Sequence, residues 1–182
     1  LQPGSVLQSR YRITGVIGVG GMGSVYRARD LHFPNVNRYV AVKEMFNLST
    51  DESMREMTFK TFERESDMLA SLSHPAVPEI YDYFPSKTRA YLVMEYINGR
   101  DLEAIINQLE DEIPVETVLQ WALALCDVLG YLHRQQPEVI FRDVKPSNIM
   151  IDEHGQLRLV DFGIAKVFHP DGPRAVQRLL VS

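Results

Sequence analysis

The chain has 182 residues and a formal net charge of −5, with hydrophobic residues at 45% and charged residues at 24%. This composition excludes an intrinsically disordered chain, and the length suits one ordinary domain or two small lobes that share a cleft. The acidic balance leaves no basic excess for phosphate contacts and argues against a nucleic-acid-binding protein. No uninterrupted apolar run approaches the roughly 18 residues of a membrane span, and the single cysteine, Cys126, fits a reducing compartment.

The first half of the sequence predicts short strands around a glycine-rich segment. Apolar residues alternate on both sides of Gly18-Val19-Gly20-Gly21-Met22-Gly23, which predicts two antiparallel strands joined by a glycine turn. Ser49-Thr50-Asp51-Glu52 has the spacing of a capping box and predicts the start of a helix that ends before Ser73-His74-Pro75. The remaining expected elements are a loop over residues 30–38 and strands over residues 39–43, 80–84 and 90–96.

Helical periodicity replaces the strand pattern after Asn98-Gly99. Residues 101–109 and 116–134 predict two helices, of which the longer has a continuous apolar face. We therefore place a domain boundary at residue 97. The remaining expected elements are short strands over residues 149–151 and 157–160.

The glycine spacing Gly18-x-Gly20-x-x-Gly23 is a weak signal by itself. Backbone without side chains can approach phosphates closely and donate N–H groups to them. In a dinucleotide-binding fold the glycines open a helix, whereas residues 24–28 alternate like a strand. No Gly-Lys-Ser/Thr ending follows, which excludes a P-loop. The segment is therefore either a phosphate-binding turn or a hairpin turn without a ligand.

Lys43 ends the strand Val40-Ala41-Val42 at a position that would face into its lobe. A lone lysine in such a place usually extends its amine to solvent. If the amine is buried it needs an anionic partner, and Glu65 on the predicted helix is the candidate. A Lys–Glu pair beside a glycine turn would suit the oxygens of a triphosphate.

Residues 139–150 carry a denser set of chemical groups. Asp143, Lys145 and Asn148 fall within six residues, and Pro146 imposes a loop. A phosphoryl-transfer site needs such groups: a carboxylate to orient the attacking hydroxyl, a cation for the γ-phosphate and a neutral oxygen for Mg²⁺. Asp161, in Asp-Phe-Gly after a hydrophobic strand, supplies a second oxygen ligand.

In this order and spacing, the motifs from about Tyr11 to Lys166 resemble those of the protein kinases. The resemblance implies an α+β, protein-kinase-like fold. An antiparallel-sheet N-lobe with one main helix would occupy residues 1–97. A partial, mostly helical C-lobe would occupy residues 98–182.

The resemblance also implies roles for individual residues. Asp143 would be the catalytic base and Lys145 the γ-phosphate ligand, while Asn148 and Asp161 would bind the metal. Lys43 would hold the α- and β-phosphates, with Glu65 as its ion-pair partner. The phosphate-covering loop would consist of Gly18, Gly20, Gly21 and Gly23. The adenosine site would include Ile17, Val25, Ala41, Met94, Glu95, Ile97, Asp101, Met150 and Val160, with Met94 as gatekeeper and Asp101 at the ribose.

The implied reaction is transfer of the γ-phosphate of ATP, with Mg²⁺, to Ser or Thr hydroxyls of protein substrates. Asp-x-Lys-Pro-x-Asn from Asp143 to Asn148 points to Ser/Thr rather than Tyr acceptors. The sequences of these motifs look most like those of bacterial protein kinases of the eukaryotic type. The need for ATP implies a cytoplasmic location, either as a free protein or as the cytoplasmic part of a membrane-anchored kinase. We expect no nucleic-acid partner and no membrane contact within this chain.

Two departures from the family pattern leave alternatives open. Phe141 stands where most kinases have His before Arg-Asp, and we expect it to fill the same apolar column as Phe162. No Ala-Pro-Glu motif follows Asp-Phe-Gly, so we expect a C-lobe truncated after that segment. Either the chain is an excerpt of a longer kinase whose missing C-terminal segment covers the partial C-lobe, or the gene product is truncated, or a partner chain covers that face. The alternatives to an active kinase are a non-catalytic, pseudokinase-like ATP-binding or partner-binding module and a small-molecule kinase.

Overall fold

The computed structural model describes residues 1–20, 23–46, 52–86, 89–109, 112–162 and 166–167. The side chains of a few positions within this part, Glu65 among them, lie outside the description. The chain forms two units, Leu1–Asn98 and Gly99–Ser182. Their boundary lies one residue after the predicted one.

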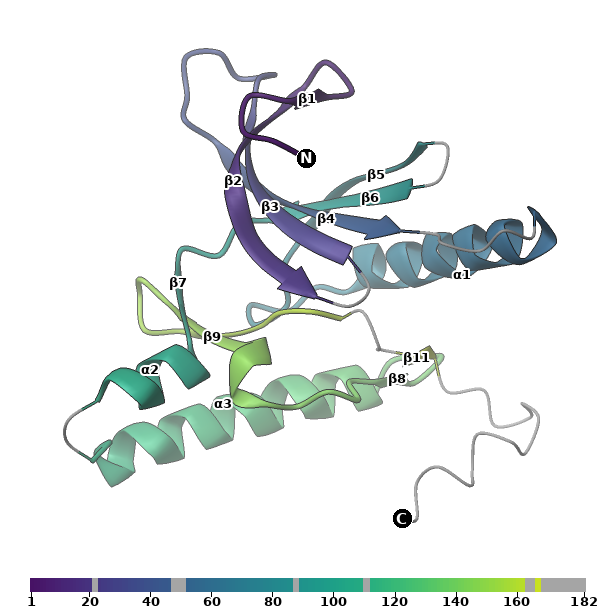
Figure 1. Cartoon of the computed structure of the whole chain (residues 1–182). Helices are drawn as coiled ribbons and strands as arrows, with labels where there is room; N and C mark the ends of the chain where they lie inside the picture. Colours follow the sequence, from purple (N-terminus) through teal and green to yellow (C-terminus); the bar gives the residue numbers. More distant parts are fainter. Residues whose placement is uncertain (21–22, 47–51, 87–88, 110–111, 163–165, 168–182) are drawn as a thin grey trace. The chain divides into compact units, whose positions relative to one another are not determined.

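Unit 1 is built on a six-stranded antiparallel sheet in the order β1-β2-β3-β4-β6-β5 (Figure 1). The predicted hairpin around the glycine segment is present, because Gly20 pairs with Gly23 at its end. The short edge strand β1 was not anticipated from the sequence. The strands are β1 (Val6–Leu7), β2 (Tyr11–Gly20), β3 (Gly23–Asp30), β4 (Tyr39–Phe46), β5 (Ile80–Ser86) and β6 (Arg89–Glu95).

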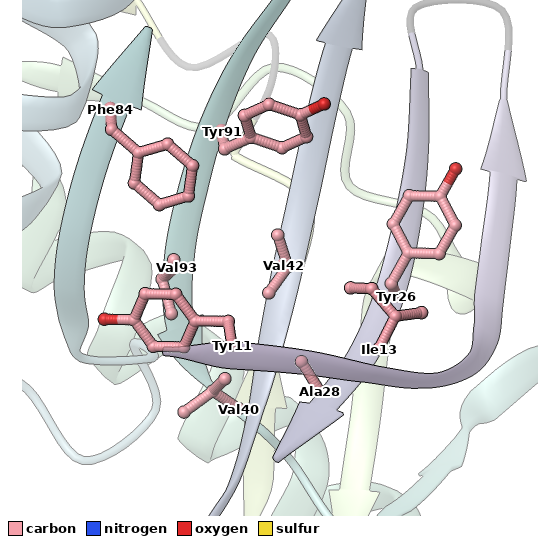
Figure 2. Close-up of a cluster of buried hydrophobic side chains, with 9 residues drawn as sticks. All are labelled: Tyr11, Ile13, Tyr26, Ala28, Val40, Val42, Phe84, Tyr91 and Val93. Carbon is pink, nitrogen blue, oxygen red and sulfur yellow. The ribbon is translucent and has the colours of Figure 1, made fainter. Parts of the chain in front are cut away.

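One face of this sheet carries the hydrophobic core of unit 1 (Figure 2). Successive side chains of a strand point to opposite faces, so Val40 and Val42 of β4 enter this core while Ala41 and Lys43 point the other way. Aromatic rings fill the rest of the face, and Phe84 and Tyr91 lie with centroids 5.2 Å apart. The core consists of Tyr11, Ile13, Tyr26, Ala28, Val40, Val42, Phe84, Tyr91 and Val93.

The opposite face of the sheet is the one on which helix α1 (Glu52–Ser71) packs. Phe62 of α1 contacts Tyr83 of β5, with ring centroids 5.5 Å apart. Tyr83 pairs with Leu92, and Leu92 pairs with Lys43, so all three lie on one face. Lys43 therefore shares the α1 side of the sheet. The predicted capping box lies partly in residues 49–51, outside the described residues.

Unit 2 combines two helices with short strands. The predicted helices are observed as α2 (Leu102–Gln108) and α3 (Val115–His133). The two predicted strands are β9 (Ile149–Asp152) and β10 (Leu157–Leu159), which form a three-stranded sheet in the order β10-β9-β7. The elements not anticipated from the sequence are β7 (Gly99–Asp101), β8 (Val139–Ile140), the 3-10 turn η1 (Pro146–Asn148) and β11 (Lys166–Val167), which pairs with β8.

Helix α3 buries only part of its apolar surface in the described structure. Val128 and Leu132, four residues apart, are fully buried, whereas Leu119 and Leu123 are 56% and 71% exposed. By length and composition alone, α3 would be apolar enough to cross a membrane. Counting uninterrupted apolar residues did not anticipate this, because Glu116 and Asp127 interrupt the run. A helix of this kind is equally typical of a protein core and is weak evidence for a membrane span.

Candidate active site

The glycine turn between β2 and β3 is held against the neighbouring strand β4. Gly23 has a φ of +153°, and a Cβ added there would lie 1.9 Å from the carbonyl oxygen of Glu44. Only glycine fits so close to another backbone in this conformation. Gly18 pairs with Val25 further along the hairpin. Gly21, which was also predicted to cover phosphates, lies outside the described residues.

Four side chains assigned to the nucleotide lie on the α1 side of the sheet. Val25 pairs with Lys43 and Ala41 pairs with Met94, and Ala41 and Lys43 are two residues apart on β4. Ala41 is buried and Lys43 is half-buried. Ile17 falls at a register shift of β2 and is half exposed. Unit 1 thus presents a lysine in a row of apolar side chains, as a site for a charged nucleotide requires.

The predicted pairing of Lys43 with Glu65 concerns a side chain outside the described residues and stays a prediction. Glu65 itself belongs to α1. The backbone amide of Glu95 already donates to the carbonyl of Glu79 at 2.8 Å. If Glu95 serves adenine, it therefore does so through another group. Ile97, two residues after the end of β6, is buried.

In unit 2, a single loop holds Asp143, Lys145 and Asn148 in mutual contact. The ammonium of Lys145 lies 2.7 Å from Oδ2 of Asp143. The side-chain amide of Asn148 donates to the same Oδ2 at 2.9 Å and to the backbone carbonyl of Asp143 at 3.0 Å. Pro146 begins the turn η1, which brings Asn148 back toward Asp143. The loop therefore assembles the acid, the cation and the amide.

The charges of this loop stabilise one another. The hydrogen bond from Lys145 lowers the pKa of Asp143 against the opposing effect of burial, and the bond from Asn148 acts in the same direction. The hydrogen bond to Asp143 raises the pKa of Lys145, and the charges of Asp161 and Glu103 add to this effect. Asp143 is therefore ionised and Lys145 is protonated at neutral pH.

Asp161 follows β10 with a backbone φ of +63°. This left-handed conformation costs a non-glycine residue roughly 1–2 kcal/mol, so the fold must hold it in place. One constraint is next to it: the amide of Val160 donates to the backbone carbonyl of Asn148 at 2.9 Å. The residue that precedes Asp161 is thus bonded to the backbone of Asn148, the other predicted metal ligand.

The oxygen atoms of Asn148 and Asp161 suit a hard cation. The amide nitrogen of Asn148 donates to Asp143, so its amide oxygen is the atom that could bind a metal. Among the described residues, no group of three or more His, Cys, Asp or Glu side chains could hold a metal alone. Mg²⁺ retains waters and usually takes one or two protein oxygens together with substrate phosphates, so a two-residue set fits it.

Asp101 has a structural task in addition to its predicted one. It caps α2, accepting a hydrogen bond from the amide of Ala104 at 2.7 Å. Asp101 pairs with Met150 across β7 and β9, so these two predicted nucleotide residues are neighbours. Val160, the third such residue of unit 2, is half-buried after β10.

Phe141 occupies the position predicted for it beside the Asp-Phe-Gly segment. Its ring meets that of Phe162 edge to face, with centroids 5.0 Å apart. Both side chains are buried. Phenylalanine in place of histidine therefore keeps an apolar contact between this position and Phe162.

Comparison with known proteins agrees with this arrangement. The sequence model of the protein kinase domain matches residues 11–180, which is most of the chain. The chain belongs to the protein kinase family. The predicted family and fold class are therefore confirmed, and the antiparallel sheet of unit 1 and the short helical part of unit 2 are those of a kinase domain.

Curated bacterial kinases are similar to this kinase chain over most of its length. A probable serine/threonine-protein kinase of Streptomyces coelicolor is 34% identical over 96% of the chain and 25% of the relative. A probable serine/threonine-protein kinase of Clostridium acetobutylicum is 35% identical over 90% of the chain and 23% of the relative. The serine/threonine-protein kinase PknB of Mycobacterium tuberculosis is 35% identical over 97% of the chain and 28% of the relative. The chain thus spans about a quarter of the length of these relatives.

Sequence reasoning missed Glu44, the residue that follows Lys43. Its side chain is fully buried in unit 1, on the face opposite to Lys43. Alternation could have revealed it, because Glu44 has the same parity as Val40 and Val42 on a strand whose inward positions are otherwise apolar.

Proposed function

We propose that this chain is the nucleotide-binding and catalytic-loop region of a serine/threonine protein kinase. The reaction is Mg²⁺-dependent transfer of the γ-phosphoryl group of ATP to a Ser or Thr hydroxyl of a protein. The observation that carries this proposal is the contact of Asp143 with both Lys145 and Asn148 in one loop. An acid, a cation and an amide in this arrangement are the groups that phosphoryl transfer requires.

Asp143 would orient the attacking hydroxyl by accepting its hydrogen bond. Its lowered pKa makes it a weak proton acceptor in the ground state but a good hydrogen-bond acceptor at neutral pH. Lys145, protonated and beside it, would stabilise negative charge on the transferring phosphoryl oxygens. In phosphoryl transfer, positioning and charge stabilisation of this kind supply most of the catalysis.

In unit 1, Lys43 and the glycine turn would hold the phosphates of ATP. The apolar neighbours Val25, Ala41 and Met94 on the same face would contact the adenine. In unit 2, Asn148 and Asp161 would hold Mg²⁺ through their side-chain oxygens. When bound, Mg²⁺ neutralises charge on the phosphate oxygens.

We place the reaction in the cytoplasm, because ATP is the phosphoryl donor there and the single Cys126 has no internal partner. The protein would act there either free or as the cytoplasmic part of a membrane-anchored kinase. Its partners would be protein substrates with Ser or Thr acceptors.

The test is phosphorylation of a generic basic protein with labelled ATP, compared between the wild-type chain and Asp143→Asn. We expect incorporation on Ser and Thr that the variant loses almost entirely. Equal incorporation by both proteins, or none by either while ATP still binds, would favour a non-catalytic ATP-binding module. Incorporation into amino-sugar or amino-alcohol acceptors in place of protein would favour a small-molecule kinase.

A further inference from the structure

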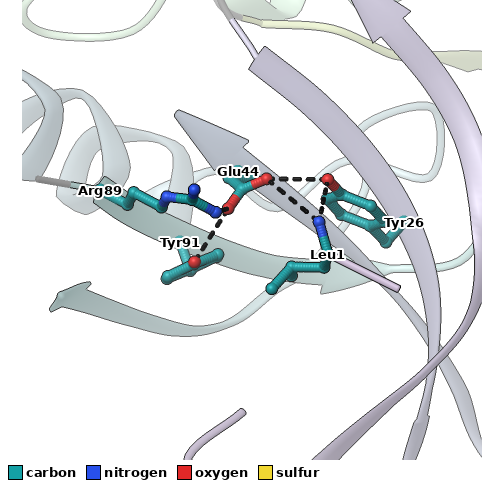
Figure 3. A network of polar contacts seen from close by, with 5 residues as sticks. All are labelled: Leu1, Tyr26, Glu44, Arg89 and Tyr91. Carbon is teal, nitrogen blue, oxygen red and sulfur yellow. Dashed lines mark hydrogen bonds and ion pairs between the residues drawn. The ribbon is translucent and has the colours of Figure 1, made fainter. Parts of the chain in front are cut away.

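Glu44 of β4 is fully buried and belongs to a network of side chains from three strands (Figure 3). One carboxylate oxygen accepts hydrogen bonds from Tyr91 at 2.9 Å and from Arg89 at 2.5 Å. The other accepts from Tyr26 at 2.8 Å, and the terminal amine of Leu1 lies 4.0 Å away. Within the described structure, this carboxylate joins side chains of β3 and β6 to β4.

The carboxylate is ionised in this setting. Burial alone would raise the pKa of Glu44, but the hydrogen bonds from Tyr26, Tyr91 and Arg89 outweigh it and lower the pKa below the ordinary value. Breaking such a network is costly, but replacing all of it by well-packed apolar residues of similar size is often neutral or stabilising. The apolar neighbours on this face, Val42 and Val93, show that the core could accept an apolar side chain at position 44. Stability alone therefore does not account for a charge at this position.

The position of Glu44 suggests another role. Its own carbonyl oxygen is the atom against which Gly23 packs, so the end of the glycine turn rests on this residue. Lys43 precedes it directly and points to the opposite face. Fixing the side chain of Glu44 therefore fixes the backbone that carries both Lys43 and the support of the turn.

We propose that Glu44, held by Tyr26, Tyr91 and Arg89, is a positioning residue that sets the phosphate-binding geometry of Lys43 and the glycine turn. This inference rests on the proposed function, because it assigns those groups to ATP. Glu44 itself touches no substrate: it lies on the other face of the sheet and acts through the backbone of β4 and through β3.

Asp30 provides a matched control within the same sheet. It is an equally buried carboxylate, 1% exposed, bonded to Arg10 at 2.8 Å through each oxygen and to the amide of His32. It ends β3, whereas Gly23 begins that strand, so Asp30 lies at the far end from the glycine turn. Asp30→Asn removes a buried charge of the same kind without touching the support of Lys43.

The experiment compares the wild-type chain with Glu44→Gln, Glu44→Asp and Asp30→Asn. A glutamine cannot accept from all three donors, and an aspartate keeps the charge on a shorter stem. Tyr91→Phe removes one donor and keeps the ring, which provides a milder variant if Glu44→Gln does not fold. The readouts are the Kd for Mg²⁺-ATP, the melting temperature, and backbone amide hydrogen exchange of β3 and β4.

We expect Glu44→Gln to weaken Mg²⁺-ATP binding about tenfold or more and to speed amide exchange near Gly23 and Lys43, with Tyr91→Phe in the same direction. Glu44→Asp should recover part of the Mg²⁺-ATP affinity and part of the protection from amide exchange. Asp30→Asn should lower the melting temperature while keeping the Kd within about twofold of wild type. If Glu44→Gln and Tyr91→Phe match Asp30→Asn in Kd and in exchange near the turn, the positioning role is wrong.

Failure of the proposed function has a different signature. A folded wild-type chain that does not bind Mg²⁺-ATP would reject the assignment of Lys43 and the turn to ATP. In that case the exchange data still decide the structural half of the inference. Faster exchange near Gly23 in Glu44→Gln than in Asp30→Asn would support the hold of Glu44 on the turn, and equal exchange would reject it.

Discussion

The side-chain amide of Asn148 donates to both the carboxylate and the backbone carbonyl of Asp143, at 2.9 and 3.0 Å. Asn148 therefore holds the acid in place, and we propose that its oxygen also binds the metal. We predict that Asn148→Ala and Asn148→Asp each lower kcat/KM for protein phosphorylation by about a hundredfold, because small displacements of a reacting group carry costs of this size. Asn107→Ala, on the exposed side of α2, should leave kcat/KM unchanged. An active Asn148→Ala protein would contradict both roles.

Gly23 is the glycine whose replacement should damage unit 1 most directly. In Gly23→Ala the added Cβ would meet the backbone oxygen of Glu44 at 1.9 Å, so β3 and β4 would have to separate. We expect a loss of about 1–3 kcal/mol in the free energy of unfolding, as for an overpacked core. Gly15→Ala is the control, since a Cβ added to Gly15 on β2 would meet nothing within 4 Å and its φ is ordinary. Urea unfolding of both variants would contradict the prediction if their midpoints were equal.

The two tasks of Asp101 can be separated by comparing Asp101→Asn with Asp101→Ala. Asparagine still caps a helix, whereas alanine leaves the amide of Ala104 without its partner, so only the alanine variant should lose about 1 kcal/mol of stability. If the carboxylate also binds ribose, both variants should weaken ATP binding several-fold. Thermal unfolding and nucleotide titration measure the two effects. Normal ATP affinity in both variants would leave Asp101 with the cap alone.

Acid should destabilise unit 1 through Glu44 and Asp30. Hydrogen bonds hold the pKa of each below its ordinary value, 4.5 for Glu and 3.8 for Asp, so the unfolded chain binds protons before the folded one does. The two carboxylates contribute fully to the free energy of unfolding above their ordinary pKa values. This contribution is lost as the pH falls through their lowered pKa values in the folded chain. We expect the melting temperature to change little through these groups from pH 7 to 5 and to fall below about pH 4.5. The difference between wild type and Glu44→Gln should shrink over the same range; a constant difference would contradict the mechanism.

The sequence predicted the strands of unit 1 and the helices of unit 2 because their signals are local. Alternation identifies β4, glycine spacing identifies the β2–β3 turn, and an apolar period identifies α3. The two-residue strands β1 and β8 escaped because they are too short to show a period and form only by pairing with a partner strand. Tertiary contacts, and not local preference, define them.

In the candidate site too, contacts between residues close in sequence could be predicted, and contacts between distant strands could not. Asp143, Lys145 and Asn148 are close in sequence, and a proline-containing turn brings them together, so their contact could be anticipated. Alternation along β4 could have predicted the burial of Glu44, but not its partners, because Tyr26, Tyr91 and Arg89 come from strands distant in sequence. The cap formed by Asp101 was hidden by its assignment to the nucleotide, although Asp before a helical segment is a common N-cap.

Phe141 gives a test of whether the loop that holds Asp143 depends on an apolar contact or on the histidine usual in kinases. Its buried ring meets Phe162 at 5.0 Å, so Phe141→Ala should lose about 3–5 kcal/mol of stability by opening a cavity. Phe141→His fills most of the same volume and should retain phosphorylation activity within a few-fold. Melting temperatures and kcat/KM distinguish the two variants. If Phe141→His abolished activity in a folded protein, this loop would depend on a property of phenylalanine that the ring contact does not explain. If Phe141→Ala melted like wild type, the contact with Phe162 would have no part in holding the loop.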